Sequence, residues 1–167
     1  MNYIYQLVIS VVAGGLGAWI AMLFALKRFY SEKWWEKRAG ALIELTNAIY
    51  QVKVLQDYYS DLKEYQRLGP DEYPNFIKLS AEKLSKLQIS AAEAKDLIVK
   101  YSNIGPLLVT ESVSKLLTDY LKREDKVDYE VNFQGLDTDD AEEHLLSLTN
   151  KLLEDLVKES KSVLKAK

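Results

Sequence analysis

Residues 3–26 limit what this chain can become more than any other stretch, because they contain no Asp, Glu, Lys, Arg or His. As a helix rising about 1.5 Å per residue, the run would measure about 36 Å, more than the roughly 30 Å of a bilayer's hydrocarbon core. Its backbone would have to be helical in lipid, where no water satisfies the peptide groups. The run is longer than the apolar part of a secretory signal and no basic residue precedes it, so cleavage is not expected. The sequence therefore predicts an uncleaved transmembrane anchor over residues 1–30.

The next twelve residues are basic and aromatic. Residues 27–38 hold five basic and two acidic side chains, whereas the formal charges of residues 39–167 sum to −6. Cytoplasmic flanks of membrane helices are rich in Lys and Arg, so we expect the N-terminus outside and the C-terminal domain in the cytoplasm. An acidic domain also disfavours nucleic acid as a partner. The residues expected at the lipid interface are Lys27, Arg28, Tyr30, Lys33, Trp34, Trp35, Lys37 and Arg38.

Small residues recur within the uncharged run, at Ser10, Gly14, Gly17, Ala18, Ala21 and Ala25. Small residues four apart let two helices approach closely in lipid, where packing drives association. These six positions are therefore expected to pair with a second copy or with another membrane helix. The alternative is that Gly and Ala are simply common in membrane helices.

Apolar residues after residue 30 recur at three- and four-residue spacing, which predicts amphipathic helices. We expect helices over 31–67, 75–102, 106–123 and from about 138 onward, with Pro106 in the first turn of the third and Asp137 or Thr138 capping the last. Residues 124–138 are expected to form a loop, although the alternation between 127 and 133 would also fit a short strand. The predicted fold is all-α: a transmembrane helix followed by an antiparallel cytoplasmic bundle of about four helices over residues 31–167. The expected core positions are Leu42, Leu45, Ile49, Val52, Ile77, Ser80, Leu84, Leu87, Ala91, Ala94, Ile98, Tyr101, Leu108, Val109, Val113, Leu116, Leu117, Tyr120, Leu145, Leu148, Leu152, Leu156 and Val163.

The sequence carries no recognisable catalytic or ligand-binding motif. It has no cysteine and a single histidine, His144, whose neighbours Glu142 and Glu143 do not share its helix face. Its one glycine-rich run lies inside the uncharged stretch, where a nucleotide cannot bind. We therefore expect no enzyme activity, no metal, no cofactor and no small-molecule substrate.

The stretch FYSEKWWEKRAGALIELTNAIYQVK, residues 29–53, resembles a segment of small, mostly uncharacterised bacterial membrane proteins with a helical cytoplasmic domain. Some of these are similar to membrane effectors of antiphage defence systems. The resemblance implies a bacterial inner-membrane location. Two hypotheses follow: an anchored, non-enzymatic module that binds a partner protein or a second copy, or a membrane-perturbing effector with a role in antiviral defence.

Overall fold

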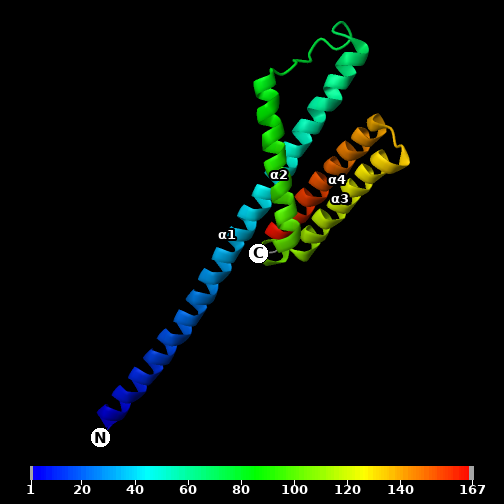
Figure 1. The fold of residues 1–167 in the computed structure, drawn as a ribbon. Coiled ribbons are helices and arrows are strands. Elements are labelled where there is room, and N and C mark those ends of the chain that lie inside the picture. Colours follow the sequence, from blue (N-terminus) through cyan, green and yellow to red (C-terminus); the bar gives the residue numbers. More distant parts are fainter. Residues whose placement is uncertain (1, 166–167) are drawn as a thin grey trace. The chain divides into compact units, whose positions relative to one another are not determined.

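The computed structural model describes the backbone of residues 2–165, together with the side chains of residues 3–6, 14–163 and 165. Four α-helices, joined in part by a π-helical turn, make up most of this part of the chain (Figure 1). The elements are α1 (Asn2–Leu68), α2 (Ala81–Leu108), α3 (Glu111–Tyr129), the π-helix η1 (Glu130–Gln134) and α4 (Thr138–Lys165). The described residues contain no strand, so the prediction of an all-helical protein is confirmed.

The chain divides into two compact units, residues 1–38 and 39–167, and the division falls inside α1. The first unit contributes only the N-terminal part of α1. The second contains the rest of α1, the other helices and the entire hydrophobic core.

The structure does not support the predicted transmembrane helix. Among the residues whose side chains are described, no helix is both long enough and apolar enough to cross a membrane. Within the described side chains that follow residue 13, Lys27 and Arg28 interrupt the apolar run, and charged side chains are costly in hydrocarbon. The prediction of a transmembrane anchor over residues 1–30 is therefore wrong for the described part of the chain.

The core of the second unit lies where all four helices contribute apolar faces. Its most enclosed apolar side chains, each with at most 2% of its surface exposed, are Leu42, Leu45, Ile49, Ile98, Val109, Val113, Leu117, Val127 and Leu156. All except Val127 were expected from their helical spacing, and α2 packs against α3 and α3 against α4 as in an antiparallel bundle (Figure 1). The helical-bundle prediction is therefore confirmed for this unit.

Helix α2 lies further along the chain than its pattern suggested. It begins after Ser80, whose Oγ accepts a hydrogen bond from the backbone N–H of Lys83 at 3.4 Å, and it includes Pro106 in its last turn. Proline cannot donate to the carbonyl four residues earlier, yet that carbonyl, on Ser102, accepts a hydrogen bond from Ser114 Oγ at 2.9 Å. A side chain from α3 thus offsets the proline, and the predicted helix over 106–123 starts instead at Glu111, after the Thr110 cap.

The acidic stretch after residue 123 is neither the expected loop nor a strand. Helix α3 continues through it to Tyr129 and buries Val127, and η1 extends it to Gln134. Gly135 then ends the helix with a φ of 74°, a left-handed conformation that glycine adopts at low cost. Asp137 accepts a hydrogen bond from the N–H of Asp139 at 2.8 Å, which confirms the predicted cap of α4.

Candidate functional site

The small residues of the first unit lie on an uncovered helix surface. Gly14, Ala18, Ala21 and Ala25 follow a four-three-four spacing that places them on one side of α1, with Gly17 beside them. All five are exposed, and a Cβ added to either glycine would meet no atom within 4 Å. The side chain of Ser10, the sixth expected position, lies outside the described residues.

Large apolar side chains are exposed around the same segment. Trp19 is 60% exposed, Met22 60% and Phe24 68%, although these residues point in different directions around the helix. Uncovered apolar surface of this extent is typical of sites that contact another protein or a membrane. Nothing in the described part of this unit covers it.

The interface residues expected from the sequence divide between two sides of α1. One side of the helix carries Lys27, Tyr30, Lys33, Trp34, Lys37 and Arg38, and another side carries Arg28 and Trp35. Glu32 and Glu36 lie roughly opposite the larger group. Glu32 forms an ion pair with Arg28 at 3.0 Å, and Glu36 forms one with Lys33 at 2.7 Å. One side of residues 27–38 is therefore both cationic and aromatic.

The second unit carries a groove that sequence patterns did not indicate. It has a volume of about 660 Å³ and is lined by Val54, Asp57, Tyr58 and Asp61 of α1 and by residues 72–77 of the α1–α2 connection. We call it the tyrosine groove. Tyr73 donates a hydrogen bond to Asp61 at 3.0 Å, and Tyr58 Oη accepts one from the N–H of Leu79 at 3.3 Å. These two bonds hold the connection against α1.

An aromatic cluster supports the groove. The ring of Phe76 lies 5.8 Å from that of Tyr58, 5.1 Å from that of Tyr65 and 6.4 Å from that of Tyr73. Ile77, which the sequence placed in the core, is instead 81% exposed beside this cluster. The sequence signal that was available, and missed, is the concentration of aromatic residues on both sides of the Gly69–Pro70 break.

A second groove, of about 430 Å³, lies between α1 and the first turns of α4. Its polar lining includes Glu64, Glu142 and Glu143, and an ion pair of 2.7 Å joins Lys63 to Asp139 across it. The hydrogen bond to Asp139 raises the pKa of Lys63. This contact ties α1 to α4 and leaves the surroundings acidic.

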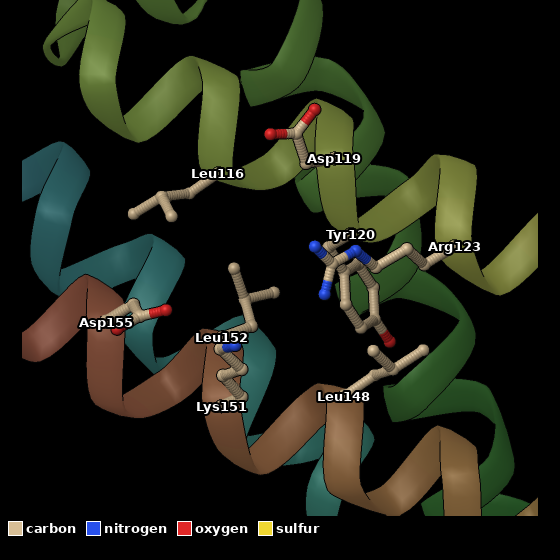
Figure 2. A pocket seen from close by; sticks show the side chains of 8 residues that line it. All are labelled: Leu116, Asp119, Tyr120, Arg123, Leu148, Lys151, Leu152 and Asp155. Carbon is tan, nitrogen blue, oxygen red and sulfur yellow. The ribbon is translucent and has the colours of Figure 1, made fainter.

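A third hollow lies between α3 and α4, where Figure 2 shows Asp119, Arg123, Lys151 and Asp155 around an apolar base. Its volume of about 90 Å³ is far below the several hundred that drug-sized ligands require. Tyr120 at its base is 4% exposed and its hydroxyl bonds to that of Thr149 at 3.1 Å. Burial, with a smaller contribution from Glu124, raises the pKa of Tyr120 to about 12.

The described side chains form no group of three metal ligands. His144 is exposed on α4 beside Asp140 and Glu143. No family model, curated protein or solved structure matches the chain.

Proposed function

We propose that this protein is a non-enzymatic helical interaction module, attached to a lipid surface by its first unit and binding a partner protein through the bundle of residues 39–167. The observation that carries the proposal is the contrast between the two units. The second has a continuous buried core, whereas the first exposes apolar side chains on several sides of its helix.

Lipid is the surrounding that best suits the first unit. Covering a large apolar side chain is worth about 1.5–3 kcal/mol, so the exposed tryptophan and phenylalanine side chains favour transfer out of water. The cationic, aromatic side of residues 27–38 adds attraction to anionic headgroups, at about 1 kcal/mol per basic residue near the surface. Aromatic and basic side chains are both favoured at headgroup depth.

A flotation assay tests the attachment. The full chain, purified in detergent and then mixed with phosphatidylcholine–phosphatidylglycerol vesicles, is expected to float with the lipid. A variant lacking residues 1–38 is expected to stay at the bottom of the gradient. A full chain that remains with the dense fraction, or a shortened chain that floats equally well, would contradict the proposal.

A membrane-perturbing effector is the second candidate, favoured by the open, exposed glycines of the first unit. If clustering through this side perturbs membranes, induced expression should lower the membrane potential, and the double substitution Gly14→Leu/Gly17→Leu should prevent that effect. Gly15→Leu is the control, because Gly15 lies about 100° from Gly14 and about 160° from Gly17 around the helix. Full-chain expression that leaves the potential unchanged would exclude this candidate.

A further inference from the structure

We infer that the tyrosine groove binds a basic segment of a partner protein, one in which a lysine or arginine lies next to an aliphatic side chain. The inference rests on the proposed function and names the surface and the partner chemistry that would serve it.

The charge of the groove selects a cation. Asp57, Asp61 and Glu72 contribute carboxylates to its lining, and no basic side chain does. Lys53 neutralises one of them, since its Nζ lies 2.6 Å from Asp57. Among its described contacts, the Asp61 carboxylate accepts a hydrogen bond only from the neutral hydroxyl of Tyr73. No ion pair in the described structure involves Glu72. Two negative charges therefore remain available to a bound cation.

The aromatic lining favours an organic cation over a metal ion. Tyr58, Tyr73 and Phe76 present ring surface in the same groove, and a lysine or arginine head group is attracted to aromatic faces. The stem of such a side chain also covers apolar surface while its charge reaches the carboxylates. Metal ions would prefer several oxygen ligands at close range, and no such group is present among the described side chains.

The exposed side chain of Ile77 provides a second contact point, so the groove can bind a short peptide rather than a single side chain. Ile77 lines the groove, is 81% exposed and offers a small apolar surface. A neighbouring aliphatic residue of the partner would cover it while the basic residue enters the groove. The acidic balance of the second unit favours the approach of such a segment over long range.

The test uses the full chain in detergent and a fluorescein-labelled peptide of repeating Lys-Val-Gly, followed by fluorescence anisotropy. Asp61→Asn/Glu72→Gln is expected to weaken binding about tenfold, by removing two charges from the groove. Its matched control is Glu93→Gln/Asp96→Asn, which removes two charges from exposed positions of α2. Equal weakening by both double variants would mean general charge attraction and would overturn the proposal.

A second pair of variants tests the apolar contact. Ile77→Ser should weaken binding about tenfold, as expected for one covered aliphatic side chain, whereas Ile89→Ser on α2 should leave it within twofold. Ile77 and Ile89 are both exposed, so neither change should affect folding. Peptides with Glu for Lys, or Ser for Val, should bind at least tenfold more weakly. Tight binding of the Glu peptide, or no effect of Ile77→Ser, would overturn the assignment.

The outcomes separate this inference from the function on which it rests. A chain that floats with vesicles but does not bind the Lys-Val-Gly peptide overturns the groove assignment alone. A chain that binds the peptide through the groove but does not float overturns the lipid attachment alone.

Discussion

Two glycines show how local space decides the effect of a single methyl group. Gly40 lies within α1 with nothing within 4 Å of an added Cβ, whereas a Cβ on Gly105 would lie 3.1 Å from Ser114 Cβ and 3.2 Å from a methyl of Val109. Alanine favours a helix over glycine by up to about 1 kcal/mol, so Gly40→Ala should raise the free energy of unfolding. Gly105→Ala should lower it by about 1 kcal/mol, because crowding in a packed core outweighs the same gain. Urea unfolding measures both; stabilisation by both variants would contradict the close packing of α2 on α3.

The buried phenol of Tyr120 predicts a loss of stability at high pH. A tyrosine in the unfolded chain titrates near pH 10, whereas burial raises the pKa of Tyr120 to about 12. The folded state therefore holds the proton more tightly, so its stabilising contribution is complete below pH 10 and is lost as the pH rises through 12. The loss from this one group amounts to about 3 kcal/mol.

Unfolding measured between pH 9 and 12 checks this expectation. Tyr120→Phe should show a shallower decline, while Tyr50→Phe, which removes an exposed phenol, should follow the wild type. Tyr101, whose pKa burial and Glu44 also raise to about 12, titrates in the same window, so part of the decline should persist. A Tyr120→Phe curve that parallels the wild type would refute the role of this side chain.

At the scale of elements, the helical periodicity predicted the core but not the helix ends. Leu42, Ile49 and Leu117 were placed correctly because their three- and four-residue spacing reflects the side of the helix that packs. Pro106 was misread as a helix start, since nothing local reveals that Ser114 would accommodate it from another helix. The tyrosine groove was missed for the same reason: the contact between Tyr73 and Asp61 spans a connection with no periodic pattern.

The contact between Ser114 and the end of α2 can be tested by a double-mutant cycle. Ser114→Ala should cost about 1 kcal/mol, because Ser102 loses the hydrogen bond that replaces the one Pro106 cannot donate. In a Pro106→Ala background the alanine N–H can bond to Ser102, so the cost of Ser114→Ala should be smaller. Chemical denaturation of the four proteins gives the coupling energy. Identical costs in both backgrounds would show that the serine hydroxyl does not compensate for the proline.

For the whole molecule, composition predicted a division into unlike parts. The change from an uncharged start to an acidic remainder was visible in the sequence, and the structure places its boundary after Arg38. The predicted membrane-spanning helix is not supported, because no helix among the described residues is long and apolar enough to cross a membrane. Which surroundings cover the first unit depends on molecules outside the chain, and no intramolecular pattern encodes them.

The bundle of residues 39–167 is expected to fold without the first unit. All buried core residues lie between Ala41 and Leu156, so deleting residues 1–38 removes none of them. The remaining α1 segment keeps Leu42, Leu45 and Ile49 against the other helices and loses mainly exposed surface. We therefore expect the shortened protein to unfold cooperatively, with a melting temperature within a few degrees of that of the bundle in the full chain. Circular dichroism measures the thermal unfolding transition, and light scattering measures the mass of the shortened protein in solution. A broad, non-cooperative transition would show that the bundle depends on the first unit.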